Sequence, residues 1–268
     1  MKKIILALLL AAPCIFMISS CKKFCIPEKK TCQIKTIQYN YLDKQTTLAY
    51  TYNNKRLLTS IAGNSSVNPP VPAITNIMYN NQGTPVSGTN FNNTPYKLIY
   101  ASGRVIRIDY LGSDNLYQPQ FNFVYDSLGR ITERVAADGS TLRWEYAGTS
   151  PNFNRMYEFY HLRPERPVEL FAMHTYEYDD KTNPWSTWQN TTLNPFYFDL
   201  IRGNVWEHMP IPQNNITHYT LYFTLRGLPL KSDEFFYTYQ YDQEYPVTQD
   251  VLRLVFNPFL PEIGRAHV

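Results

Sequence analysis

One segment, Phe121–Val135, constrains the fold of this chain more than any other. Its aromatic residues Phe121, Phe123 and Tyr125 lie two positions apart, so in an extended strand their rings share one face. Gly129 follows where a short hairpin turn requires a positive φ, and the Asp after the tyrosine can hydrogen-bond the turn backbone. A second alternating strand then returns. The segment therefore predicts a β-hairpin with one aromatic face.

Weaker copies of this unit recur roughly every 20 to 30 residues, a spacing typical of stacked supersecondary repeats. Copies that keep the turn begin at Tyr52, Tyr79, Tyr100 and Phe223, and copies that keep the strand lie at Tyr39/Tyr41, Tyr176/Tyr178 and Tyr237/Tyr239/Tyr241. Chance alternation in a protein with 22 Tyr and 15 Phe is the alternative. Recurrence of the turn after the aromatic residue argues against it. No long segment has helical periodicity, so we predict an all-β fold.

The run Tyr-Asp-x-x-Gly-Arg-Ile at 125–131 resembles the YD repeat of RHS-type proteins. Segments 178–185 and 214–218 also resemble short YD-repeat lipoproteins of Gram-negative bacteria. The resemblance covers about residues 38–257, with one strongly matching unit. It implies tandem β-hairpins joined in one meandering antiparallel sheet, which in so short a chain stays open and curved. It implies no activity that could be carried over to particular residues.

The N-terminus has the pattern of a bacterial lipoprotein signal peptide. Two lysines precede an apolar run at 4–18, and Ser-Ser-Cys21 completes a lipobox, so residues 1–20 are predicted to be removed. A transmembrane helix is the alternative, but it needs about 20 apolar residues and Pro13 interrupts this run. By resemblance to bacterial lipoproteins, Cys21 becomes the acylated first residue of the mature chain. Acyl chains then hold the protein on a membrane without a spanning helix.

Residues 21–37 are predicted to be the tether that joins the lipid to the repeat domain. Lys22 and Lys23 differ from the Asp that retains enteric lipoproteins at the inner membrane. The sequence therefore favours the outer membrane, with its periplasmic face preferred over the cell surface. The formal charge is +3 and falls to about +1 without the signal lysines, so no basic footprint for nucleic acid is present.

Two further cysteines, Cys25 and Cys32, lie close together in the tether. In an oxidising compartment such a pair predicts a small disulfide loop. Zinc binding is the alternative, but a second Cys/His pair at ligand spacing is missing. We expect no metal and no cofactor, because metal-binding, P-loop and dinucleotide motifs are absent from the sequence. The five histidines lack catalytic spacing and are predicted to lie on the surface or in loops, so no catalytic residue is assigned.

The repeat rhythm is interrupted in one segment, about residues 181–215, which we term the insertion. It contains Trp185, Trp188, Trp206 and Tyr197 among several asparagines. Aromatic rings beside amide side chains are typical of sugar-binding surfaces, which makes these four residues the candidate ligand site. The alternative is that the insertion caps one end or one face of an open sheet.

Three functions remain open from the sequence. The first is a lipid-anchored binding or scaffolding protein of the cell envelope that recognises a glycan or an envelope protein. The second is a glycan hydrolase that uses Asp199 and Glu207 in the insertion. The third is a remnant of an RHS shell or toxin system.

Residues 258–268 are predicted to be a tail outside the repeat domain. The last seven residues, Glu262–Val268, back-translate into a common sequencing-library adapter and are interpreted as an assembly artefact. On this interpretation His267 has no functional role.

Overall fold

We describe a computed structural model of the chain. The chain divides into two compact units, Met1–Cys32 and Gln33–Val268. All the described residues belong to the second unit. The structure describes residues 36–41, 44–65, 75–90, 92–161, 165, 167–183, 186, 193–194, 197–199, 204–206, 209–225, 228–242 and 245–256.

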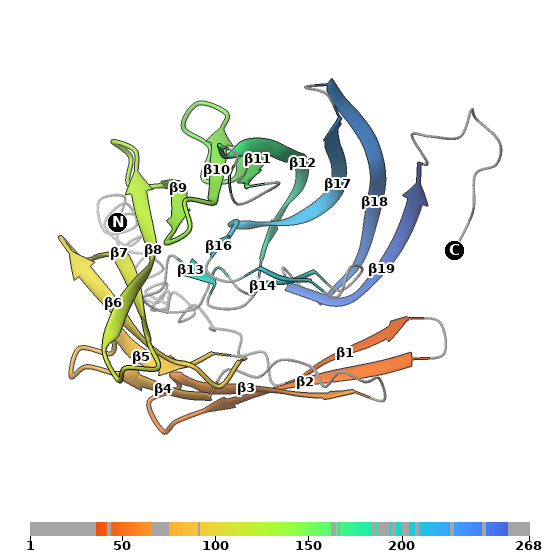
Figure 1. Ribbon diagram of the computed structural model, residues 1–268. Helices are drawn as coiled ribbons and strands as arrows, with labels where there is room; N and C mark the ends of the chain where they lie inside the picture. The colour runs from red at the N-terminus through yellow and green to blue at the C-terminus, as the bar shows by residue number, and fades with distance from the viewer. Residues whose placement is uncertain are drawn as a thin grey trace, which may run out of the picture. The chain divides into compact units, whose positions relative to one another are not determined.

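The main body is a twelve-stranded antiparallel meander with the order β19-β18-β17-β12-β11-β10-β9-β8-β7-β6-β5-β4 (Figure 1). Its strands are β4 (Thr75–Tyr79), β5 (Pro85–Thr89), β6 (Pro95–Ala101), β7 (Arg104–Leu111), β8 (Tyr117–Tyr125), β9 (Ile131–Ala136), β10 (Thr141–Tyr146), β11 (Phe153–Tyr160), β12 (Glu169–Thr182), β17 (Asn214–Leu225), β18 (Leu228–Asp242) and β19 (Tyr245–Val255). The end strands β4 and β19 do not pair with each other, so the sheet is open. Its long strands β17 and β18 bend along their length (Figure 1). These observations confirm the predicted all-β, open meandering sheet.

Three smaller sheets accompany the meander. Strands β1 (Thr36–Tyr41), β2 (Lys44–Tyr52) and β3 (Leu58–Ser65) form a three-stranded sheet. Strand β13 (Leu193–Asn194) pairs with β16 (Met209–Pro210), and β14 (Tyr197–Asp199) pairs with β15 (Asn204–Trp206). Both two-stranded sheets lie within the insertion, which joins β12 to its neighbour β17. Within the described residues, no helix has the length and apolar character that crossing a membrane requires.

The predicted YD turn forms between β8 and β9. Asp126 accepts hydrogen bonds from the backbone N–H groups of Leu128 at 3.0 Å and Arg130 at 2.9 Å. Gly129 has φ 80°, and a Cβ built on it would clash with the Arg104 guanidinium. Glycine is therefore favoured at this position by its backbone conformation, and a larger residue would have to displace the arginine side chain.

The same turn recurs with other residues. In the turn after β2, Asn53 replaces Asp126 and accepts from the N–H groups of Lys55 and Leu57. Arg56 adopts φ 62° where the YD unit has glycine. Asn80 and Asn90 accept hydrogen bonds in the same way at the next two turns. The aromatic residue and the Asx side chain therefore identify the turn better than glycine does.

A repeated tyrosine hydrogen bond joins each hairpin to the one before it. A Tyr in the second half of one strand donates its hydroxyl to a backbone carbonyl near the start of the preceding strand. We call this contact the tyrosine clamp. The donor and acceptor pairs are Tyr79 and Leu58, Tyr100 and Pro85, Tyr125 and Val105, Tyr146 and Ile131, Tyr178 and Phe153, and Tyr239 and Ile216, at 2.6 to 2.8 Å.

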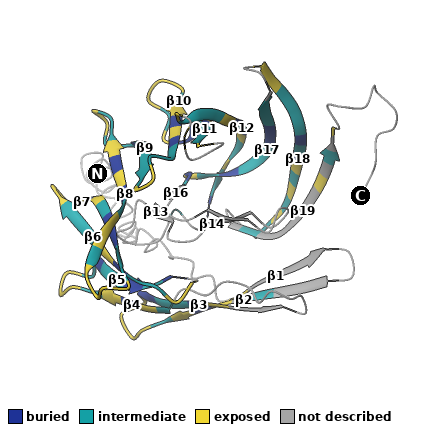
Figure 2. Cartoon of the chain, in the orientation of Figure 1, coloured by how far each residue is buried: buried dark blue, intermediate teal, exposed yellow. Residues whose placement is uncertain are grey.

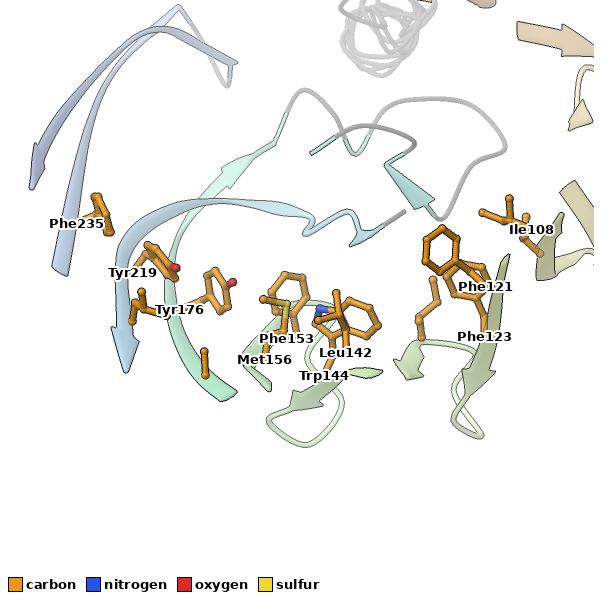
Figure 3. Close-up of a cluster of buried hydrophobic side chains, with 14 of the residues drawn as sticks. Ile108, Phe121, Phe123, Leu142, Trp144, Phe153, Met156, Tyr176, Tyr219 and Phe235 are labelled. Atoms are coloured by element: carbon orange, nitrogen blue, oxygen red, sulfur yellow. The ribbon is translucent and has the colours of Figure 1, made fainter. Parts of the chain in front are cut away.

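One face of the main sheet carries a continuous apolar core, which we call the core face. Ten of its side chains are labelled in Figure 3, from Ile108 through Trp144 to Phe235. Buried and exposed residues alternate along strands such as β8 and β10, as Figure 2 shows. This alternation is the period of two that the aromatic spacing predicted.

Candidate functional site

Most of the residues assigned from the sequence fall outside the described part of the chain. These are Cys21, Cys25, Cys32, Trp185 and Trp188, together with Glu207 and the tail. Lipidation, the disulfide loop and the binding role of these tryptophans therefore stay predictions.

The backbone of the other two candidate ligand residues is described. Tyr197 in β14 and Trp206 in β15 are register partners in a small antiparallel sheet. Asp199, the carboxylate assigned to the hydrolase hypothesis, pairs with Asn204 at the other end of the same sheet. The structure thus brings two of the four aromatic positions together in one hairpin of the insertion.

The insertion leaves and re-enters the main sheet at a hydrogen-bonded base. Asn183 N–H donates to the Gln213 carbonyl at 2.8 Å where the two chain segments meet. Asn152 is a buried residue in the link between β10 and β11, and its side chain accepts a hydrogen bond from the Gln213 N–H at 2.7 Å. Its amide also donates to the Asn214 side chain at 2.8 Å. One buried asparagine therefore fixes the point where the insertion ends.

A second set of side chains holds the same base from β12 and β18. Asp179 accepts from the backbone N–H groups of Lys181 at 3.0 Å and Asn215 at 3.1 Å. The Tyr241 hydroxyl donates to the other oxygen of Asp179. Burial and this hydrogen bond raise the pKa of Tyr241 to about 12. We call Asn152, Asp179, Asn214, Asn215 and Tyr241 the insertion anchor.

A buried polar triad lies on the core face in the middle of the C-terminal strands. His174 and Glu158 are 1% and 3% exposed in their side chains, and Nε2 of the imidazole pairs with Oε1 of the carboxylate. Nδ1 of His174 lies 2.8 Å from the Tyr219 hydroxyl. Asp233 is also buried, two strands away from His174 across Leu221. The prediction that the histidines lie on the surface or in loops is wrong for His174, because its strand buries alternate residues.

The triad combines a carboxylate, an imidazole and a phenol, which are groups that can exchange a proton. Its burial keeps these groups away from solvent, so the geometry favours a structural role. Buried polar groups need hydrogen-bond partners to offset the cost of desolvation. The Tyr219 hydroxyl satisfies the second nitrogen of the imidazole.

A third titratable cluster lies on the opposite face of the same strands. His218 lies 3.2 Å from Glu177 through Nδ1 and 2.9 Å from Glu234 through Nε2. Lys231 also pairs with Glu234 at 2.6 Å. Although burial raises the pKa of Glu234, hydrogen bonds from Lys231 and His218 lower it further than burial raises it. The two carboxylates lie on opposite nitrogens, so they do not converge with the imidazole on one metal ion. Across the described residues, no group of three or more His, Cys, Asp or Glu is placed to hold a metal ion.

No protein-family model and no curated protein matches the chain. Among solved structures, the chain is similar to a porin-like protein from Bacteroides uniformis, at 12% identity and a TM-score of 0.49 over 87% of this chain and 91% of that one. A TcdB2-TccC3 structure is similar at 11% identity and a TM-score of 0.28, over 82% of this chain and 14% of that one. A Photorhabdus luminescens Tc holotoxin pore is similar at 11% identity and a TM-score of 0.31, over the same shares. All three similarities are distant.

Proposed function

We propose that this protein is a lipid-anchored binding protein of the cell envelope in which the meander is the scaffold and the insertion is the recognition element. One observation carries the proposal. Strands that neighbour each other elsewhere in the main sheet are joined by short links, whereas β12 and β17 are joined by the insertion. The insertion anchor holds this long link at both ends, as a binding loop on a rigid scaffold requires.

The proposed ligand is a glycan, with an envelope protein as the alternative partner. Support comes from the composition of the insertion, in which Trp185, Trp188, Trp206 and Tyr197 supply rings for stacking on sugar C–H faces. The pairing of Tyr197 with Trp206 places two of these positions side by side.

The proposed cellular location is the periplasmic face of the outer membrane, with Cys21 as the lipidated residue. The lipobox and the two lysines after it support this assignment. We further propose that the chain is a short YD-repeat protein of the RHS type. The Tyr125 clamp supports this, because the best-preserved YD unit joins its hairpin to the preceding one.

A glycan array and envelope pull-downs with the chain beginning at Lys22 test the binding function. We expect a sugar or envelope-protein signal that falls at least about ten-fold, or about 1.4 kcal/mol, in Trp206→Ala. Tyr157→Ala is the matched control, because Tyr157 is an aromatic residue in β11 of the main sheet and not in the insertion. An absence of signal for the unaltered protein in both assays would exclude the ligand-binding proposal.

A second variant tests whether the scaffold positions the insertion. Asn152→Ala removes the side chain that bonds Gln213 and Asn214 while leaving both strands paired. We expect weaker binding with an unchanged β-sheet signal in circular dichroism. Binding equal to that of the unaltered protein would show that the insertion acts without its anchor.

A further inference from the structure

The two edges of the main sheet are protected to different extents. At one edge, β4 has five residues, and two register irregularities interrupt its pairing with β5. Its Tyr79 also reaches across to Leu58 of β3, so the clamp continues beyond this edge. At the other edge, β19 has eleven residues and, among the described residues, pairs with β18 alone. Long unpaired edges are templates for pairing with another chain.

Little in β19 blocks such pairing. A Pro at position 246 and a register shift at Gln240/Tyr241 lie at the end where the strand begins. The rest of β19 contains no proline. Beside this edge, three large apolar side chains are exposed, Phe236 at 38%, Leu252 at 42% and Phe256 at 36%. Phe236 and Leu252 are register partners, so their exposed area is continuous across β18 and β19.

The clamp defines what would fit this edge. Strands β5, β7, β9, β11 and β17 each enter the sheet after a turn or the insertion, and each supplies a carbonyl near its start to a tyrosine of the following strand. β19 runs antiparallel to β18 and therefore in the same direction as these strands. In each clamp the acceptor residue is the register partner of the tyrosine two strands before the donor, as Val105 is of Tyr100. By this rule the acceptor in β19 is the backbone carbonyl of Gln249, the register partner of Tyr239.

We propose that β19 is a docking edge for an extended segment of a partner protein that adds an antiparallel thirteenth strand and ends in a tyrosine. The segment alternates apolar and polar residues, because one of its sides must cover the exposed Phe236 and Leu252 on the face opposite the core face. Its tyrosine donates to the Gln249 carbonyl of β19, as Tyr239 does to Ile216 one strand earlier. Main-chain hydrogen bonds give the affinity, and the tyrosine gives the register.

A peptide copied from one of the protein's own clamp strands tests this. Residues Ser140–Tyr146, with the sequence Ser-Thr-Leu-Arg-Trp-Glu-Tyr and capped ends, include Tyr146, whose hydroxyl bonds the first carbonyl of β9. We expect the peptide to bind the purified protein and to slow hydrogen exchange of the amides in Tyr245–Val255 only. A Tyr146→Phe peptide should bind about five-fold more weakly, the ratio for loss of one hydrogen bond of about 1 kcal/mol.

Three results would overturn the proposal. The first is that the peptide does not slow amide hydrogen exchange in β19, and the second is that the tyrosine and phenylalanine peptides bind equally well. The third is that the β19 amides are already protected from exchange in a dimer of the protein without peptide. The last result would make a second copy the occupant. The peptide assay contains no sugar, so its outcome is independent of the glycan array.

Discussion

Strands β6 to β10 and strands β11 to β18 belong to one sheet and share the tyrosine clamp, but they bury different side chains on the core face. On the core face the buried residues of the first group are apolar or aromatic, for example Ile108, Phe121 and Trp144, and its buried Asp109 follows Ile108 on the other face. The second group also buries Glu158, His174 and Asp233 on that face. The core face of the first group therefore needs only apolar packing, whereas that of the second depends on polar groups that must satisfy one another.

The sharpest way to break this contrast is to remove one partner of the triad. We expect Glu158→Ala to lower the free energy of unfolding by about 3 to 5 kcal/mol, because it leaves His174 buried beside an empty carboxylate position. Urea unfolding followed by circular dichroism measures the change. The double variant Glu158→Leu with His174→Met should lose less than half as much. An equal loss in the double variant would mean that packing, and not the polar pair, is responsible.

Alkaline pH should act on the clamp. Burial, with a further contribution from Tyr52, raises the pKa of Tyr79 to about 12, and burial also raises the pKa of Tyr100 and Tyr146. These phenols ionise more easily in the unfolded chain, whose tyrosines have pKa values near 10. Their stabilising effect is therefore complete below pH 10 and is lost as the pH rises toward 12.

The measurement is the urea midpoint between pH 9 and pH 12. We expect a steady fall above pH 10 that is shallower in Tyr79→Phe, because this variant lacks one of the ionising groups. A midpoint that stays constant to pH 12 would contradict the assignment of buried, hydrogen-bonded phenols.

Two glycines in YD-type turns allow the next comparison. Gly103 and Gly129 both have positive φ, but a Cβ at Gly103 would meet nothing within 4 Å, whereas one at Gly129 would meet the Arg104 guanidinium. Gly103→Ala should therefore cost about 1 to 2 kcal/mol from the backbone alone. Gly129→Ala should cost more, because the arginine must also move. Thermal unfolding of the two variants measures the difference, and equal losses would show that Arg104 adapts freely.

The hairpins were predictable from the sequence because their signals are local. Tyr125 and Gly129 define a turn within five residues, and even the turn at Arg56, which lacks glycine, was predicted from the aromatic residue before it. The insertion anchor was not predictable, since Asn152 bonds Gln213 from a distant part of the chain. The same holds for the triad, where strand register alone brings Glu158 near His174.

The smallest predicted effect tests whether the clamp is a stabilising contact at all. Tyr125→Phe keeps the ring on the core face and removes only the hydroxyl that bonds the Val105 carbonyl at 2.7 Å. The expected loss is about 1 kcal/mol, since the carbonyl loses a hydrogen-bond donor in a partly buried site. Tyr157→Phe is the control, because the Tyr157 hydroxyl bonds Glu145 in an exposed position, where water replaces the lost partner. We expect Tyr157→Phe to change stability by less than about 0.5 kcal/mol. Equal losses in the two variants would mean that the recurring tyrosine is retained for its ring, and the β19 docking edge would then lack its proposed register signal.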